Sequence, residues 1–384
     1  VGLDRSSTEQ PILSEDLIVK VMRTGSLAGV TLVSALALAA CGSGNNTNAS
    51  TNPSASSSGA ASCATGSLSG QGSTFQANAE LQWAKDYAAK CSGATVAYEG
   101  TGSGAGKTAF GNGTADFGGT DSLPKPEEQT AADKRCGTGN KGIVTPIVAG
   151  AVVLTYNIDG VDKLTLDATT VAKIFEGTIK KWNDPAIAAL NSGVTLPSTT
   201  IVPVHRNDSS GTTQIFATWL DKNDPTDWKL GASQTLTWPG GQSAKGSDGV
   251  TSVVAGAKGG LTYTELSFAK AQSLKVAGIK NAAGTVVTPS SSSVSSALKT
   301  ATVDTSHGDI RVTPDYATKT ADAYPLSAPS YVLTCDKGNK SAALLKGYFT
   351  YALTDGTAAL DGLGYAPLPD TIATQAKAAV AALS

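Results

Sequence analysis

Three segments of this sequence share one order of features: a short β-like run, a turn of Gly, Ser or Thr residues, and a helix-like run. Their turns lie at residues 72–75, 102–106 and 208–212. Around them, strand-like and helix-like runs alternate along the body of the chain, which predicts an α/β fold with helices covering the faces of its sheets. Folds of this class bind ligands at helix N-termini, beyond the ends of the strands.

The chemistry of the three turns favours an anionic ligand. Glycine lets backbone N–H groups approach a ligand closely, hydroxyl groups donate further hydrogen bonds, and the start of a helix carries positive partial charge. Ser and Thr are also the ordinary N-caps of helices, so a single turn of this kind indicates little. Three of them in one chain predict an anion site.

Two charged residues narrow the choice of anion. Arg206 directly precedes the third turn, where a guanidinium group can bind two oxygens of a tetrahedral anion. Asp121 ends the segment 116–121, just after a strand-like run. An ionised carboxylate only accepts hydrogen bonds, so it fits an anion that keeps a proton at neutral pH, as phosphate does. From the residues alone, a surface arginine and an ordinary turn aspartate remain as alternatives.

Seven motifs in one order connect the chain to a known family. Over residues 66–384 they resemble the substrate-binding protein of the bacterial high-affinity phosphate ABC transporter, in a Gly- and Ser-rich style typical of actinobacteria. The motifs are GSTF at 72–75, YEGTGSGAG at 98–106, DFGGTD at 116–121, IFEGTIKKWNDP at 174–185, HRNDSSGTT at 205–213, WPGG at 238–241 and GYAPLP at 364–369.

The resemblance implies a two-lobed clamp of the type II periplasmic-binding-protein class. Each lobe is a mixed sheet flanked by helices, and two crossover segments join the lobes. Mapped onto this sequence, lobe I comprises 63–146 plus 323–384 and lobe II comprises 147–322. Ligand contacts from both lobes would favour closure of the clamp.

The resemblance also implies a ligand set for phosphate, without metal or cofactor. Asp208 is expected to orient Arg206. The sequence departs from the family pattern at two positions: Ser209 stands where a Gly is common, and Thr120 replaces the usual Ser. Neither departure removes a hydrogen-bond donor. The implied ligands are Thr74, the Phe75 N–H, Ser103 and Asp121 from lobe I, and Arg206, Ser210, the Gly211 N–H and Thr212 from lobe II.

The N-terminal region is interpreted as an export signal. Met22, the single methionine, is followed by Arg23 and by an apolar run at 27–40 that ends in LAAC at 38–41. This resembles a bacterial lipoprotein signal, in which Cys41 becomes the lipid-modified (palmitate-bearing) first residue; a plain signal peptide is the alternative. Residues 1–21 are then a misassigned upstream start, 22–41 the signal, and 42–62 a flexible linker too polar and small-sided to fold.

Four cysteines remain when Cys41 is set apart. An exported chain meets oxidising conditions, so we expect two disulfides, for which three pairings exist. Cys63 precedes a predicted strand and Cys91 ends the helix after it, which places both at one end of a βα unit. We therefore pair Cys63 with Cys91 and, by elimination, Cys136 with Cys335, with free buried thiols as the alternative.

The composition argues against several other functions. A formal net charge of −2 lacks the basic surplus of a nucleic-acid binder. Two histidines, His205 and His307, are too few for the clusters of a metal-dependent phosphatase, so we expect no enzyme. We expect a monomer on the outer face of the cell membrane that delivers phosphate to the permease and ATPase subunits of an importer. The alternatives are an exported phosphatase, a binder of another oxyanion, and a structural lipoprotein with a vestigial site.

Overall fold

The computed structural model describes residues 63–384. The expected upstream segment, signal, lipid site Cys41 and linker at 42–62 lie outside these residues. Among the helices of the described part, none has the length and apolar character needed to cross a membrane.

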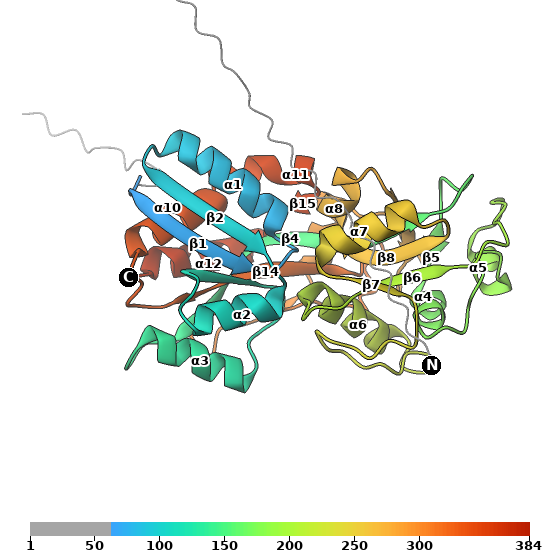
Figure 1. The fold of residues 1–384 in the computed structure, drawn as a ribbon, viewed down its shortest axis with the longest axis horizontal. Coiled ribbons are helices and arrows are strands. Elements are labelled where there is room, and N and C mark those ends of the chain that lie inside the picture. The colour runs from blue at the N-terminus through green and yellow to red at the C-terminus, as the bar shows by residue number, and fades with distance from the viewer. Residues whose placement is uncertain (1–62) are drawn as a thin grey trace, which may run out of the picture. The chain divides into compact units, whose positions relative to one another are not determined.

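One mixed sheet of ten strands runs through the described chain (Figure 1). Eight strands follow the order β2-β1-β3-β14-β4-β8-β6-β7, and β9 and β15 also pair with β4. Two small sheets, β11-β10-β5 and β12-β13, lie outside it. The strands of the large sheet are β1 Gly66–Gly72, β2 Ala94–Gly100, β3 Phe117–Thr120, β4 Gly142–Asn157, β6 Val202–Arg206, β7 Gln242–Ala244, β8 Gly260–Glu265, β9 Lys275–Val276, β14 Ser327–Cys335 and β15 Tyr365–Ala366. Those of the small sheets are β5 Thr165–Leu166, β10 Gly278–Lys280, β11 Val286–Val287, β12 Thr302–Asp304 and β13 Arg311–Thr313.

The helices gather beside the two halves of this sheet and make the fold a two-lobed α/β clamp, as the sequence predicted (Figure 1). Lobe I holds β1–β3 with α1 Ala77–Lys90, α2 Ser103–Gly111, α3 Pro126–Cys136, α10 Ala342–Ala352, α11 Leu360–Leu363 and α12 Asp370–Ala382. Lobe II holds β6–β8 with α4 Ala168–Phe175, α5 Pro185–Leu190, α6 Gly211–Asn223, α7 Gly246–Gly256, α8 Leu266–Ala271 and α9 Ser291–Leu298. A short 3₁₀ helix, Asp355–Ala359, precedes α11.

The strands β4 and β14 link the two halves. β4 pairs with β14 through its first part and with β8 through its second, both antiparallel. The expected lobe boundary at 146/147 falls inside β4, and the one at 322/323 falls just before β14; both boundaries stay predictions.

One local expectation was wrong. Because proline and glycine weaken the interior of a strand, the sequence predicts that Pro146 and Gly150 break the β-like run 143–156, yet β4 is a continuous strand of 16 residues. Proline cannot donate to a strand ladder, so it is tolerated mainly at bulges. Here the register with β14 shifts between Ser330 and Tyr331, which leaves Ile147 of β4 unpaired, and this bulge next to Pro146 accommodates the proline.

Each lobe has its own aromatic core. In lobe I, Tyr98 stacks on Phe117 with ring centroids 5.9 Å apart. In lobe II, Tyr263 stacks with Phe216 at 4.3 Å and with Trp238 at 6.0 Å. Two rigid aromatic clusters therefore support the strand ends from which the turns emerge.

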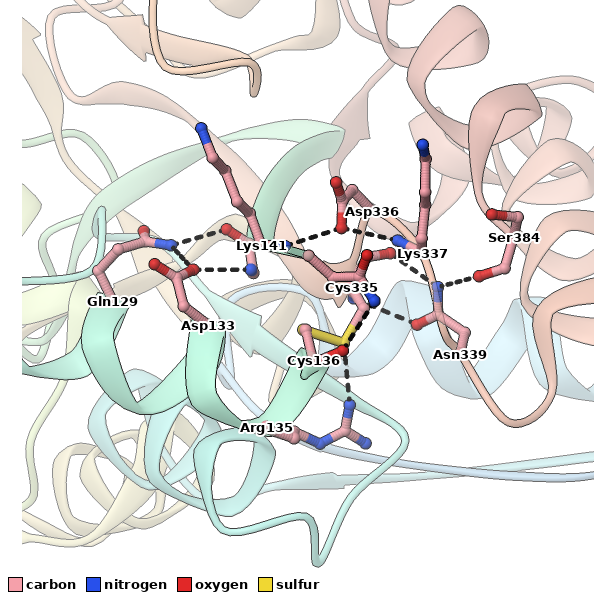
Figure 2. The surroundings of a disulfide bond; sticks show 12 residues. Gln129, Asp133, Arg135, Cys136, Lys141, Cys335, Asp336, Lys337, Asn339 and Ser384 are labelled. Carbon is pink, nitrogen blue, oxygen red and sulfur yellow. Dashed lines mark hydrogen bonds between the residues drawn. A yellow bond between two sulfur atoms is a disulfide. The ribbon is translucent and has the colours of Figure 1, made fainter. Parts of the chain in front are cut away.

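Two disulfides join the cysteines in the pairs inferred from the sequence, Cys63 with Cys91 and Cys136 with Cys335. The second connects the end of α3 to the end of β14 (Figure 2). Arg135 Nη1 approaches its Cys335 Sγ at 3.5 Å, and Asn339 exchanges hydrogen bonds with the Cys335 backbone. This bond ties the C-terminal part of lobe I to its N-terminal part.

Replacing Cys136 and Cys335 together by serine should lower the free energy of unfolding more than the same change at Cys63 and Cys91. The sequence separations are 199 and 28 residues, and loop-closure entropy gives roughly 5 and 3.5 kcal/mol respectively. Urea unfolding of the two double variants measures the difference. Equal losses, or the reverse order, would contradict the entropic account.

A buried carboxyl group lies in the core of lobe I. Glu80 on α1 is completely buried, and its Oε2 accepts a hydrogen bond from Tyr348 Oη at 2.6 Å. Its Oε1 has no partner within the described chain. Burial raises the pKa of Glu80 from 4.5 to about 8, against the lowering effect of the Tyr348 bond. Glu80 therefore stays protonated at neutral pH.

The free energy of unfolding of the wild type, compared with that of a Glu80→Gln variant, should fall as the pH rises. A group whose pKa is raised on folding stabilises the fold fully below its unfolded pKa and loses that contribution as the pH passes through the folded value. The window here runs from about pH 4.5 to about pH 8, and the change should be roughly 3–5 kcal/mol. Urea unfolding of both proteins at pH 5 and pH 8.5 measures it. Parallel pH profiles would show that Glu80 does not titrate in this range.

Candidate functional site

The sheet places the first two turns and Asp121 at one edge. β1 pairs in parallel with both β2 and β3, with Gly72 opposite Gly100 on one side and Gly119 on the other. Parallel neighbours end at the same edge of a sheet, so Ser73, Ser103 and Asp121 follow three adjacent strand ends. Gly102, which precedes α2, has a φ of 98° that favours glycine.

Asp121 is the centre of a cluster of hydroxyl groups. Its Oδ1 accepts hydrogen bonds from Ser73 Oγ at 2.5 Å and from Ser330 Oγ at 2.6 Å. Its Oδ2 accepts from Ser103 Oγ at 3.2 Å, and the Asp121 N–H donates to the same hydroxyl at 3.1 Å. Burial raises the pKa of Asp121 to about 6, opposed by the bonds from Ser330, Ser73 and Ser103. The carboxyl group is thus ionised at neutral pH.

Arg206 lies at the end of β6 in lobe II and is itself buried. Its Nε and Nη2 donate to the two carboxylate oxygens of Asp208 at 2.6 and 2.5 Å, a bidentate pair. Burial disfavours the charge on Asp208, but the hydrogen bonds and the charge of Arg206 outweigh it and hold the pKa of Asp208 below its ordinary value. This pair holds the guanidinium group in one orientation.

The remaining nitrogen of the guanidinium group, Nη1, contacts one hydroxyl from each lobe. Arg206 Nη1 donates to Thr74 Oγ1 and to Ser247 Oγ, each at 3.1 Å, and these two hydroxyls are 2.7 Å apart. Tyr263 Oη accepts a hydrogen bond from the Arg206 N–H at 3.1 Å. The aromatic core of lobe II thus fixes the strand end that carries the arginine.

Gly211 brings the two groups together. It starts α6, and a Cβ atom at this position would lie 2.5 Å from Asp121 Oδ2 and 2.5 Å from Ser103 Oγ. Only a residue without a side chain allows this approach. The start of α6, which carries the positive end of the helix dipole, therefore lies beside the Asp121 cluster.

The other predicted ligands lie in the same region with their groups engaged within the protein. The Phe75 N–H donates to Ser73 Oγ at 2.9 Å. Ser210 Oγ accepts from the Thr213 N–H at 3.1 Å and so caps α6. Thr212 Oγ1 donates to Glu265 Oε1 at 2.5 Å. All eight predicted ligands thus gather around one place between the lobes, and their role as ligands stays a prediction.

Four residues of the site were not among the predicted ligands. Ser73 belongs to the GSTF motif, whose presence signalled it. Ser247 follows Gly246 at the start of α7, a fourth turn of the same kind that the sequence reasoning passed over. Ser330 and Glu265 lie on the buried strand β14 and at the end of β8, where no local signal marks them.

The two departures from the family pattern have clear places in the structure. Thr120 Oγ1 donates to the Ser122 carbonyl at 2.7 Å and accepts from its N–H at 3.2 Å, which fixes the turn that carries Asp121. Ser209 lies against Gly104 of the second turn, where any added Cβ atom would collide with its hydroxyl. Within residues 63–384, no group of three or more His, Cys, Asp or Glu side chains is arranged to hold a metal ion.

Comparison with known proteins agrees with this geometry. A family model described as a PBP superfamily domain matches residues 46–356. The phosphate-binding protein PstS 3 of Mycobacterium leprae is 36% identical over 374 residues, which cover 95% of this chain and 100% of that protein. The chain belongs to the PstS family of phosphate-binding proteins. Other PstS relatives include PstS 2 of Mycobacterium tuberculosis, 35% identical with the same coverage, and PstS of Xylella fastidiosa, 36% identical over 81% of this chain and 84% of its own.

Solved structures support the fold of this PstS relative. A high-affinity periplasmic phosphate-binding protein, PfluDING, solved with phosphate, has a TM-score of 0.64 at 22% identity and covers 81% of this chain and 93% of its own. The phosphate-binding protein of Stenotrophomonas maltophilia has a TM-score of 0.62 at 18% identity, with 82% and 93% coverage. The two-lobed fold and the family resemblance inferred from the motifs are thereby confirmed.

Proposed function

We propose that this chain binds one inorganic phosphate between its two lobes and delivers it to the permease and ATPase subunits of an ABC importer. The observation that carries the proposal is that a hydrogen-bond acceptor and positively charged donors lie close together between the lobes. The hydrogen-bond-accepting carboxylate of Asp121 lies on one side, and the guanidinium of Arg206 with the start of α6 lies on the other. A protonated tetrahedral anion offers both a donor and several acceptors to such a site.

The ligands in this proposal are the hydroxyls of Thr74, Ser103, Ser210 and Thr212, the N–H groups of Phe75 and Gly211, and the side chains of Asp121 and Arg206. In the structure Ser103 binds Asp121 and Arg206 binds Thr74, whereas the Phe75 N–H and Ser210 Oγ bind other groups of the protein. A bound phosphate would accept hydrogen bonds from these donors in place of their present partners. Binding therefore exchanges hydrogen bonds within the protein for hydrogen bonds to phosphate. The relatives named as PstS are binding proteins, and we infer the same non-enzymatic role here, in a monomer.

Isothermal titration of phosphate into the protein, with EDTA present, tests this proposal. We expect one site per chain and an unchanged affinity when the chelator is omitted, because the ligand set contains no metal site. The absence of phosphate binding would overturn the proposed function. Binding that is lost in EDTA would overturn the metal-free site.

We further propose that Cys41 anchors the mature chain to the outer face of the membrane. Changing Cys41 to Ala should release the protein from the membrane fraction or block removal of the signal, because the lipid is attached to that sulfur. Fractionation and intact-mass analysis of the wild type and the variant measure this. An unmodified residue 41 in membrane-bound wild type would contradict the anchor.

A further inference from the structure

Gln234 connects the two lobes beside the anion site. It lies in lobe II, between α6 and β7, and is 5% exposed. Its Nε2 donates to Ser122 Oγ of lobe I at 2.5 Å, and its Oε1 accepts from Lys107 Nζ of lobe I at 3.4 Å. A buried amide group needs partners for both its donor and its acceptor. For Gln234, the donor partner and one acceptor partner lie in the other lobe.

The same residue is fixed within its own lobe at the third turn. Ser209 Oγ donates to Gln234 Oε1 at 3.2 Å, and the Ser210 N–H donates to the Gln234 carbonyl at 3.0 Å. Next to it, the Gly104 N–H of lobe I donates to the Ser209 carbonyl at 3.1 Å. The turn that precedes α6 is thus held to Gln234 and to the second turn together.

Its partners in lobe I are buried and held by other contacts of that lobe. Lys107 projects from α2, one turn after Ser103, and its side chain is 1% exposed. Lys107 Nζ forms an ion pair with Glu128 at 2.7 Å and contacts Ser122 Oγ at 3.3 Å. Ser122 follows Asp121 directly and is held by Thr120. Gln234 therefore meets a preformed, charge-compensated surface next to two predicted phosphate ligands.

We propose that Gln234 is a positioning residue for phosphate binding: it fastens lobe II to Ser122 and Lys107 when the lobes are closed. We call these contacts of Gln234 with Ser122 and Lys107 the clasp. The inference rests on the proposed function, because the role of the clasp is to retain bound phosphate. The side chain of Gln234 is not among the predicted ligands, so it acts through the lobes and not on the anion. These bonds form only in the closed state, because each joins one lobe to the other. They bias the lobe equilibrium toward closure and slow the release of phosphate.

A double-mutant cycle on Gln234→Ala and Ser122→Ala tests the clasp. Loss of one buried hydrogen-bond partner should raise the phosphate dissociation rate, and with it Kd, by roughly 5- to 100-fold. The second substitution should add much less than the first, since both remove the same contact. Stopped-flow release of phosphate gives the rates, and spin labels on the two lobes report the closed population with and without phosphate.

The matched control is Gln242→Ala, the same truncation at an exposed position of lobe II. It should leave the dissociation rate unchanged. Three results would each overturn the clasp. They are a wild-type phosphate dissociation rate in Gln234→Ala, purely additive effects in the double-mutant cycle, and an unchanged closed population. A wild type that binds no phosphate at all would instead overturn the proposed function, so the two failures are distinguishable.

Thermal unfolding without ligand should be similar in all variants, which separates the clasp from a general loss of stability.

Discussion

Replacing Asp121 by asparagine should largely remove the preference of this protein for phosphate over sulfate. Asparagine keeps the shape, removes the negative charge and adds an N–H donor. In the wild type, an oxygen of sulfate would face the carboxylate acceptor without a proton between them, whereas phosphate supplies that proton. A site that leaves a buried polar group unpaired rejects the wrong ligand by roughly 10⁴–10⁵, about 5–7 kcal/mol. Sulfate affinity should therefore rise in the variant, while phosphate affinity changes less.

Titration of both anions into both proteins at one ionic strength measures this preference. Asp116→Asn is the matched control, because Asp116 precedes the same strand but binds Ser69 and not the cluster. It should keep the wild-type preference. If the sulfate-to-phosphate ratio does not move in Asp121→Asn, Asp121 is not the proton acceptor.

The pH dependence gives a second test of the same carboxylate. The pKa of Asp121 is raised to about 6 in the ligand-free protein. Above that pH the ionised group only accepts hydrogen bonds, so it binds the O–H of phosphate and excludes sulfate; below that pH the protonated group can donate a hydrogen bond to a sulfate oxygen. Sulfate affinity of the wild type should therefore increase as the pH falls through about 6. The asparagine variant should not show this increase, because its amide does not titrate.

The α/β class and the three turns could be predicted because their signals are local, whereas the two-lobed fold and the ligand set were implied by the family resemblance. The strand–turn–helix order around 72–75, 102–106 and 208–212 reflects requirements of backbone geometry and helix capping that are written within a few residues. Asp121 directly follows the end of β3, beside the first two turns, and Arg206 ends β6, directly before the third turn. The disulfide partners could be inferred for the same reason, since Cys63 and Cys91 flank one βα unit.

What could not be predicted depends on contacts between distant segments. Ser330 and Glu265 lie 209 and 53 positions from the residues they bind, Asp121 and Thr212, and they occupy ordinary buried strands. The continuity of β4 through Pro146 depends on a bulge at Ile147, which forms where β4 pairs with the distant strand β14. The contacts of Gln234 with lobe I likewise exist only once the two lobes are closed.

Removing the guanidinium of Arg206 should weaken phosphate and sulfate binding alike. Arg206→Met keeps much of the apolar stem, but it leaves the carboxylate of Asp208 partly buried, uncompensated and close to the anion. Breaking a buried ion pair from one side costs roughly 3–5 kcal/mol, which corresponds to a loss of about 10²–10³-fold or more in affinity. Because the arginine contacts no proton of the ligand, the ratio of the two affinities should stay near the wild-type value, unlike in Asp121→Asn.

The partner Asp208 provides the control for this experiment. Asp208→Asn keeps the guanidinium charge and an amide oxygen for Arg206 Nε, so it should cost much less phosphate affinity than Arg206→Met. The double variant Arg206→Met/Asp208→Asn should bind phosphate better than Arg206→Met alone, since it removes the carboxylate that repels the anion. Thermal unfolding of each variant separates loss of binding from loss of the fold. A double variant no better than the single one would show that electrostatic repulsion by Asp208 is not the cause, and an Arg206→Met loss below tenfold would exclude the guanidinium as a phosphate ligand.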